Sequence, residues 1–320
     1  MYYMGVDVGS VSTDITILDE DNNVVEGIYL RTKGRPIDAI INGFNMLKDK
    51  YGDEEIKGVG CTGSGRKICS YFIGADAVKN EITAHATAAL EIDQSVRTII
   101  EIGGQDSKII ILNDGIVTDF AMNTVCAAGT GSFLDRQAER LGININDFGK
   151  LALNSKNPVR IAGRCAVFAE SDMIHKQQVG CRQEDIIRGL CEALVRNYLS
   201  NVGKGKDIKE KIFFQGGVAA NEGIRKAFEN NLQCKVHVPK NYDLMGSIGA
   251  ALIAKDVVNI KGKTNFRGFN ICKDKFTSQT TECIGCSNRC EIVKIINNGK
   301  LLGAFGDRCG KFTNTIENVV

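Results

Sequence analysis

One stretch of this chain is repeated at a distance that matches a whole domain. Residues 6–18 (VDVGSVSTDITIL) and 100–112 (IEIGGQDSKIIIL) align without gaps at an offset of 94 residues. Each copy has a strand pattern, a glycine-rich tight turn and a second alternating strand, which predicts a β-hairpin. A period of this size is too long for the repeat of a solenoid. We therefore expect a duplicated α/β domain with a cleft between the copies.

The segments around the two hairpins fit the same two-lobe plan. A further short strand follows each copy, at NNVVEGIYL and GIVTDFAM, and amphipathic helical patterns come after it. The glycine-rich helical segment MGSIGAALIAKDVV near the end of this region is expected to return to the first lobe. These patterns predict a first lobe over 1–95, a second lobe over 96–240, and a return to the first lobe over 241–260.

Composition excludes several functional classes. The 320 residues are 43% hydrophobic and 24% charged, and the net charge of +2 gives no reason to expect a nucleic-acid or anionic-membrane partner. No apolar stretch approaches the length needed to span a bilayer. The start of the chain, MYYMGVDVGS, lacks the charged and apolar regions of a signal peptide. We expect a cytoplasmic protein.

Three glycine-rich turns are candidates for nucleotide binding. Glycine lets successive backbone N–H groups approach phosphate oxygens closely, and neighbouring hydroxyls add donors. The candidate residues are Gly9, Ser10, Val11 and Ser12 in the first turn, Gly103, Gly104 and Gln105 in the second, and Gly216, Gly217 and Asn221 in the third. None of the turns matches the Walker A or the dinucleotide fingerprint, which disfavours P-loop and Rossmann folds.

Polar side chains in these turns suggest roles in nucleotide hydrolysis. Asp7, directly before the first turn, is a candidate for holding Mg²⁺. Gln105 or Asp106 would orient the attacking water, since phosphoryl transfer depends mainly on positioning and charge stabilisation. A further group follows Cys126 directly and is expected to reach phosphate as well: Gly129, Thr130 and Gly131.

Twelve cysteines are many for a chain expected in a reducing compartment, where disulfides are rare. Cys126 and Cys165 each precede small residues and a helical pattern, and a helix N-terminus stabilises a thiolate. They supply half of the four sulfurs that an iron–sulfur cube needs, so a symmetric dimer would complete the set. Two buried thiols are the alternative. We interpret five others as structural: Cys61, Cys69, Cys181, Cys191 and Cys234.

The character of the chain changes near its end. Residues 261–320 look like an appended cysteine-rich, metal-binding module with a hairpin around Asn298-Gly299. The module offers five candidates for four ligand positions: Cys272, Cys283, Cys286, Cys290 and Cys309. Tetrahedral sulfur coordination suits Zn²⁺ or an iron–sulfur cluster, and the pattern does not choose between them.

The order of these motifs resembles one known family. DVGS, EIGGQDSK, CAAGTG, CAVFAES and GGVA occur in the order found in activators of 2-hydroxyacyl-CoA dehydratases, a family that also contains ATPase subunits of benzoyl-CoA reductase. The resemblance covers roughly residues 4–255. It implies a duplicated ribonuclease-H-like fold of the actin and sugar-kinase type, with ATP or ADP and Mg²⁺ in the interlobe cleft. It also implies a homodimer in which Cys126 and Cys165 of both subunits hold one bridging [4Fe–4S] cluster.

The resemblance implies an activity as well. ATP turnover would drive a single low-potential electron into a partner enzyme, either a 2-hydroxyacyl-CoA dehydratase or a double-cubane cluster protein, with a ferredoxin or flavodoxin as donor. The cysteine-rich module departs from the short activators and looks more like longer homologues and reductases of double-cubane proteins. Two other interpretations remain: a sugar or carboxylate kinase of the same fold, and a non-catalytic nucleotide sensor with a zinc module.

Overall fold

The computed structural model describes residues 1–123 and 125–313, whose contacts divide them into two compact units. The first unit comprises Met1–Glu81 and the described residues from Gly246 onward, and the second comprises Ile82–Met245. The division falls earlier than the expected boundary at 95/96, because α3 (Glu81–Ile92) packs on the second sheet. There His85 Nδ1 lies 2.9 Å from Gln215 Oε1. No helix in the described part of the chain is both long and apolar enough to cross a membrane.

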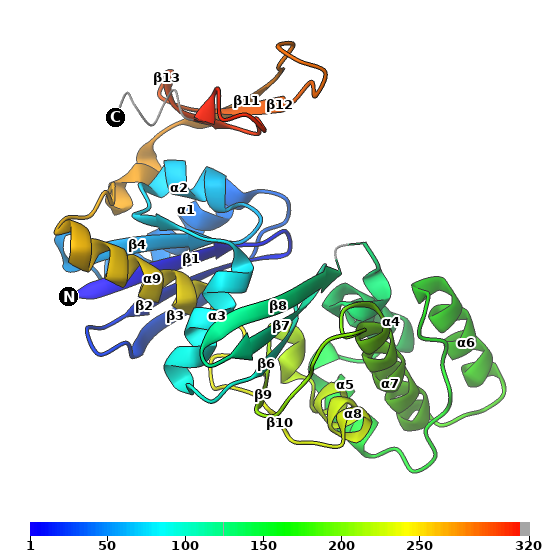
Figure 1. Cartoon of the computed structure of the whole chain (residues 1–320). Coiled ribbons are helices and arrows are strands. Elements are labelled where there is room, and N and C mark those ends of the chain that lie inside the picture. The colour runs from blue at the N-terminus through cyan, green and yellow to red at the C-terminus, as the bar shows by residue number, and fades with distance from the viewer. Residues whose placement is uncertain (124, 314–320) are drawn as a thin grey trace. The chain divides into compact units, whose positions relative to one another are not determined.

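The two units contain sheets of the same topology (Figure 1). The first has the order β3-β2-β1-β4-β5, built from Val24–Arg31, Ser12–Leu18, Tyr2–Val8, Ile56–Thr62 and Ala77–Val78. The second has the order β8-β7-β6-β9-β10, built from Ile116–Asn123, Ser107–Asn113, Thr98–Ile102, Ile212–Gln215 and Val236–His237. In the first sheet, β1 and β2 form an antiparallel hairpin and β4 pairs in parallel with β1. In the second, β6 and β7 form the equivalent hairpin and β9 pairs in parallel with β6. The duplicated hairpins predicted from the repeat are therefore confirmed.

Helices cover both faces of the first sheet, in Figure 1 as in the contacts. The helices concerned are α1 (Pro36–Leu47), α2 (Arg66–Ile73) and α9 (Met245–Lys261). Because side chains alternate along a strand, Ile15 and Thr16 point to opposite faces. Gly43 of α1 contacts Ile15, whereas Thr16 Oγ1 lies 2.6 Å from Ser247 Oγ of α9.

Glycines in two neighbouring strands let α9 approach the sheet closely. A Cβ atom at Gly5 would overlap the carbonyl oxygen of Ser247, and one at Gly60 would overlap that of Ala250. Any larger residue at either position would push the helix away from the sheet. The start of α9 is thereby held beside the carboxyl end of β1, where Asp7 lies.

The second unit has a helical layer packed on one face of its sheet. Its helices are α4 (Gly131–Leu141), α5 (Ile145–Leu153), α6 (Ala166–Gln178), α7 (Gln183–Asn201) and α8 (Glu222–Leu232). Tyr198 of α7 is fully buried against Phe228, with ring centroids 5.2 Å apart, and its hydroxyl donates to Lys108 O over 2.7 Å. This contact fixes the last turns of α7 to strand β7.

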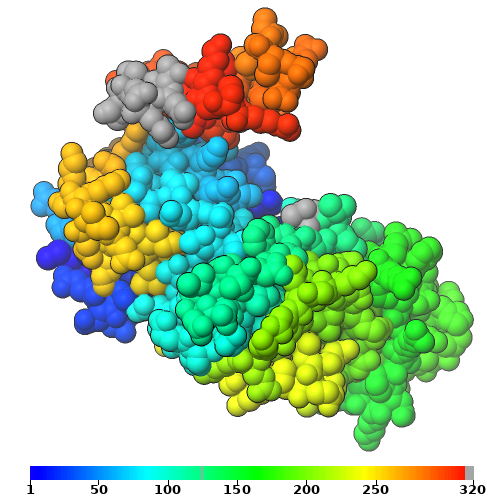
Figure 2. Space-filling model, in the orientation of Figure 1, coloured from blue at the N-terminus to red at the C-terminus, as the bar shows by residue number. Residues whose placement is uncertain are grey.

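The cysteine-rich module forms a three-stranded antiparallel sheet of β11 (Phe276–Glu282), β12 (Glu291–Asn297) and β13 (Lys300–Phe305). Asn298 and Gly299 both have positive φ in the turn before β13, which confirms the predicted hairpin. The sheet packs on α2, where Phe72 and Phe276 have ring centroids 4.2 Å apart. Figure 2 shows the red residues of this sheet against the blue and cyan part of the chain, with orange residues projecting beyond them.

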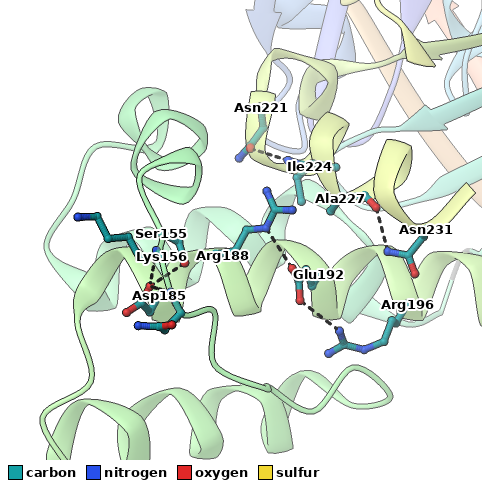
Figure 3. A network of polar contacts seen from close by, with 11 residues as sticks. Ser155, Lys156, Asp185, Arg188, Glu192, Arg196, Asn221, Ile224, Ala227 and Asn231 are labelled. Carbon is teal, nitrogen blue, oxygen red and sulfur yellow. Dashed lines mark hydrogen bonds and ion pairs between the residues drawn. The ribbon is translucent and has the colours of Figure 1, made fainter. Parts of the chain in front are cut away.

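A carboxylate fixes the start of α7. Asp185 Oδ1 accepts hydrogen bonds from Ser155 Oγ at 2.7 Å and from the backbone N–H groups of Lys156 and Asn157 (Figure 3). These bonds, that of Ser155 above all, lower the pKa of the Asp185 carboxyl. The charged carboxylate therefore ties the loop before α6 to the first turn of α7, where the helix dipole also favours it.

This anchor predicts a pH-dependent stability. Because the pKa of Asp185 is lowered in the folded chain, its charge stabilises the fold above about pH 4, and this contribution is lost as the pH falls through the folded-state pKa. Asp185→Asn keeps the Oδ1 acceptor but loses the charge. We expect the variant to unfold at lower denaturant concentration than the wild type at pH 7. The difference between the two midpoints should shrink as the pH falls below about 4, and a constant difference would contradict this account.

Candidate functional site

Three of the predicted glycine segments lie together in the second unit. The turn between β6 and β7 is closed by a bond from Gly103 N to Asp106 O at 3.0 Å. Gly131 N donates to Gly103 O, and Ser132 N donates to Gly104 O, both at 2.9 Å, so the start of α4 is bonded to this turn. Gly216 has φ +84°, and a Cβ there would lie 2.5 Å from Ile102 O. The strand ends, the turn and the α4 start therefore form one compact backbone site.

A buried ion pair supports this turn. Lys108 Nζ lies 2.8 Å from Glu101 Oε2 and 3.0 Å from Asp106 Oδ1, and the Lys108 side chain is only 3% exposed. Burial raises the pKa of Glu101, and the charge of Lys108 opposes the rise. Lys108 thus fixes the orientation of Asp106, while Gln105 is exposed at the tip of the turn. The sequence analysis missed Lys108, because a lysine in a strand normally faces solvent.

Two other predicted residues have local structural bonds. Asn221 Oδ1 accepts from Ile224 N at 3.0 Å and caps α8, as Figure 3 shows. Gly217 opens the short 3₁₀ helix before it. The buried Thr130 hydroxyl donates to Ala127 O at 2.8 Å. These contacts shape the backbone around the turn, and nucleotide binding by these residues stays a prediction.

The first unit holds the remaining predicted turn. Gly9 N donates to Ser12 O at 2.8 Å, and the hydroxyl of Thr32 donates to Gly9 O at 2.9 Å. Ser10 is exposed in this turn, beside Val11. The turn is therefore closed by backbone and side-chain bonds, with one hydroxyl on its surface.

Asp7 lies just before this turn, between two glycine backbones. A Cβ at Gly63 would lie 2.5 Å from Asp7 Oδ1, and one at Gly246 would overlap Asp7 Oδ2. Neither glycine was identified from the sequence, although the run GCTGSG over 60–65 follows a strand and carries the signal of a glycine loop. The carboxylate is thus enclosed by backbone, close to the start of α9.

The two cysteines of the second unit have different local settings. Cys165 precedes α6 directly as its N-cap residue, as the sequence pattern predicts. Cys126 instead precedes a short 3₁₀ helix, Ala127–Gly129, and α4 begins only at Gly131. Asn123 holds Cys126 through its side chain, since Oδ1 accepts from Cys126 N at 2.9 Å and Nδ2 donates to Cys126 O at 2.8 Å. Both thiols are partly exposed.

One buried side chain contacts both cysteine segments. Asn197 Nδ2 lies 3.8 Å from Cys126 Sγ and donates to Gly163 O at 2.6 Å, two residues before Cys165. Asn197 is 3% exposed. The structure therefore joins two segments that are separated by about forty residues of sequence, through a residue that the sequence analysis did not identify.

The cysteines of the module are not equivalent. Cys283 N donates to Cys290 O at 2.8 Å, and Cys286 O accepts from Arg289 N at 3.2 Å, so these three belong to one turn. Cys272 is half-buried against α1, where its thiol lies 3.7 Å from Ile41 O, and burial raises its pKa. Among residues 1–123 and 125–313, no three His, Cys, Asp or Glu side chains already converge as a metal-binding group.

Of the five cysteines interpreted as structural, three are buried and two, Cys181 and Cys234, are partly exposed. Cys61 and Cys69 are buried with their sulfurs 3.0 Å apart. Burial raises the pKa of Cys191 to about 12, which keeps it a neutral thiol. Cys181 is partly exposed after α6.

Comparison with known proteins assigns the class. The duplicated α/β fold matches that of a solved dehydratase activator that holds a nucleotide analogue. The model of the BadF/BadG/BcrA/BcrD ATPase family matches residues 4–254, and the chain belongs to this family. The module beyond residue 254 lies outside the match.

Relatives and solved structures agree with this assignment. The chain is 36% identical to the 2-hydroxyisocaproyl-CoA dehydratase activator of Clostridioides difficile, over 80% of this chain and 96% of the relative. It is 34% identical to the (R)-2-hydroxyglutaryl-CoA dehydratase activating ATPase of Acidaminococcus fermentans, over 79% and 97%. The structure of the Clostridium difficile activator with bound ADPNP superimposes with a TM-score of 0.75 at 34% identity, covering 82% of this chain and 97% of that one.

The glycine at position 216 offers a test of the site. Gly216→Ala introduces a methyl group 2.5 Å from Ile102 O and 2.7 Å from Glu101 Oε1. We expect ATP hydrolysis to fall on the order of tenfold or more, because the strand end and turn must separate. Gly142→Ala is the matched control, since Gly142 also has positive φ (+67°) but no neighbour within 4 Å. Equal ATPase rates in the two variants would contradict the assignment of this site.

Proposed function

We propose that this chain is an ATP-dependent single-electron reductase that activates a partner iron–sulfur enzyme. In this proposal, a homodimer holds one [4Fe–4S] cluster through Cys126 and Cys165 of each subunit, and ATP hydrolysis makes electron transfer directional. The observation that carries the proposal is the bonding of Gly131 and Ser132 to the carbonyls of Gly103 and Gly104. It places the glycine turn within a few residues of Cys126.

The residues of the turn have distinct proposed roles. Asp106, already oriented by Lys108, would position the attacking water together with Gln105. Asp7 would hold Mg²⁺, and the turn Gly9–Ser12 would contact phosphate. A shift of the turn on ATP binding or hydrolysis must move the start of α4, because both of its first N–H groups are bonded there. Nucleotide can favour one arrangement only by binding it more tightly than the other.

The chemistry of the cysteine pair fits a bridging cluster. Two partly exposed thiols per chain are half of the ligand set of a four-iron cluster. The backbone at Cys126 is bonded to the amide of Asn123, and the backbone before Cys165 is bonded to the amide of Asn197. When bound, the cluster would supply a one-electron, low-potential donor. Large apolar side chains beside the cysteines are exposed, with Val125 at 94%, Val167 at 68% and Phe168 at 65%. Such side chains favour burial against a second copy of the chain.

The proposed partners follow from the relatives. Several are activators of 2-hydroxyacyl-CoA dehydratases, and another is a subunit of the benzoyl-CoA reductase of Thauera aromatica, 25% identical over 78% of this chain. We propose a dehydratase of this kind or a double-cubane cluster protein as the electron acceptor, and a ferredoxin or flavodoxin as the donor.

Metal analysis tests the cluster. Anaerobically purified wild-type protein should be a dimer with about two irons per chain at the bridging site. Cys126→Ser and Cys165→Ser should each lose these two irons. Cys181→Ser, which changes another partly exposed cysteine of the same unit, should retain them. Absence of iron after anaerobic reconstitution would overturn the proposal, and substrate-dependent phosphate transfer would then identify a kinase.

We also propose a second metal site in the module, formed by Cys283, Cys286, Cys290 and Cys309. The strand register brings their segments together. Glu282 and Glu291 are the last paired residues of β11 and β12, and the adjoining Cys283 and Cys290 are joined by a backbone hydrogen bond. Gly306, which follows β13, contacts Glu291 O. Cys309 follows three residues later. Cys272 is assigned to the core against α1, which leaves four thiols for Zn²⁺ or an iron–sulfur cluster.

Two serine variants separate these assignments. Cys290→Ser should lower the metal content by one zinc or about four irons per chain, and leave the bridging irons in place. Cys272→Ser should keep the full content, because its thiol contacts only the protein core in this assignment. Inductively coupled plasma mass spectrometry of both variants decides between them. Loss of metal in Cys272→Ser, or full retention in Cys290→Ser, would refute the four-cysteine assignment.

A further inference from the structure

The segment before Cys165 is held by contacts from two helices, α6 and α7. Arg196 Nη2 donates to Ile161 O at 2.7 Å, and Ala162 N donates to Asp172 Oδ2 at 2.8 Å. Asn197 Nδ2 donates to Gly163 O, and a Cβ at Gly163 would lie 2.8 Å from Ala193 O. Helices α6 and α7 together therefore leave this short segment little freedom before the cysteine.

Arg196, which directly precedes Asn197 on α7, is oriented by a network of ion pairs. Arg188 and Arg196 flank Glu192 at one-turn intervals along the helix, as Figure 3 shows. The Nε of Arg188 lies 3.1 Å from Glu192 Oε1, and Arg196 Nη1 lies 3.9 Å from Glu192 Oε2. Arg196 is thereby aligned so that its other amino group reaches Ile161 O.

The amide of Asn197 is fixed in one orientation. Its Oδ1 accepts from Asn201 Nδ2 at 2.9 Å, so its Nδ2 is the atom that faces Gly163 O and Cys126 Sγ. A Cβ at Gly129 would lie 2.8 Å from Asn197 Oδ1, so the glycine gives the amide its room. The Nδ2 atom carries two hydrogens, so it can donate both to a carbonyl on one cysteine segment and to the sulfur of the other.

We propose that Asn197 is a positioning residue that holds the two cysteine segments in register and donates an N–H group to the Cys126 sulfur. This inference rests on the proposed cluster function. A donor beside a ligand sulfur stabilises the additional negative charge of the reduced cluster, so it makes the reduction potential less negative. The same bond holds the first ligand at a constant distance from the segment of the second.

The test uses the full-length dimer and two substitutions. Asn197→Asp keeps the size of the side chain but removes the Nδ2 donor, and Asn197→Ala removes the amide. Asn231→Asp is the matched control. Asn231 Nδ2 also donates to a backbone carbonyl, that of Ala227, but both residues lie on α8, away from the cysteine segments (Figure 3). We expect both Asn197 variants to have a more negative midpoint potential and to lose iron to a chelator roughly tenfold faster. The control should match the wild type in both.

A second measurement tests the anchoring in the metal-free protein. Hydrogen exchange followed by mass spectrometry should show faster exchange in both 126–132 and 159–165 for Asn197→Ala, and in neither segment for Asn231→Asp. If the Asn197 variants do not fold, Asn201→Ala replaces them, because it releases Asn197 Oδ1 and should shift the potential in the same direction by less.

The outcomes separate this inference from the function beneath it. Wild-type protein without iron would refute the cluster. Faster hydrogen exchange of both 126–132 and 159–165 in Asn197→Ala would still support the anchoring role of Asn197. Wild-type protein with iron, and folded Asn197 variants with unchanged potential and iron loss, would refute the role of Asn197 alone. Faster exchange with an unchanged potential would reduce Asn197 to a structural residue and refute the sulfur bond.

Discussion

The backbone bonds between the turn at Gly103–Gly104 and the start of α4 fix these two parts of the second unit to each other. The first N–H groups of a helix have no partner within the helix, and elsewhere they bind anions or side-chain caps. Here those of Gly131 and Ser132 are already bonded to the carbonyls of the turn. The α4 N-terminus is therefore fixed to the turn, and Cys126 receives its side-chain polar contacts from Asn123 and Asn197.

The duplication explains why the two units share a plan and where they differ. Asp7 and Glu101 occupy equivalent positions at the ends of β1 and β6. Asp7 is enclosed by glycine backbone, whereas Glu101 is buried beside Lys108. Burying a carboxylate without a counter-charge costs several kcal/mol, so loss of Lys108 alone would leave Glu101 as an unfavourable buried charge. One scaffold thus holds a carboxylate enclosed by glycine backbone at one strand end, where we propose Mg²⁺ binding, and an ion pair that supports a turn at the other.

The sequence predicted what depends on local pattern and failed where a residue acts through distant contacts. Glycine turns, alternating strands and the Asn298-Gly299 hairpin have local signals, and all of these elements occur as expected. Asn197 sits in a long amphipathic helix, where an asparagine normally reads as a surface residue. Lys108 likewise gains its role only when Glu101 is paired opposite it across the hairpin. The distinct setting of Cys272 required knowledge of what α1 covers.

The module beyond the family match is part of the hydrophobic core of the first unit. Phe269 is 3% exposed and packs on Phe44 of α1, with ring centroids 5.3 Å apart, and Phe276 packs on Phe72 of α2. Helix α2 begins after the loop in which Gly63 encloses Asp7 and in which Gly65 N donates to Val8 O. Because buried aromatic contacts are rigid, a displacement of this loop cannot leave the module unaffected. The short helix α2 therefore connects the cysteine-rich sheet with the loop beside the proposed Mg²⁺ site.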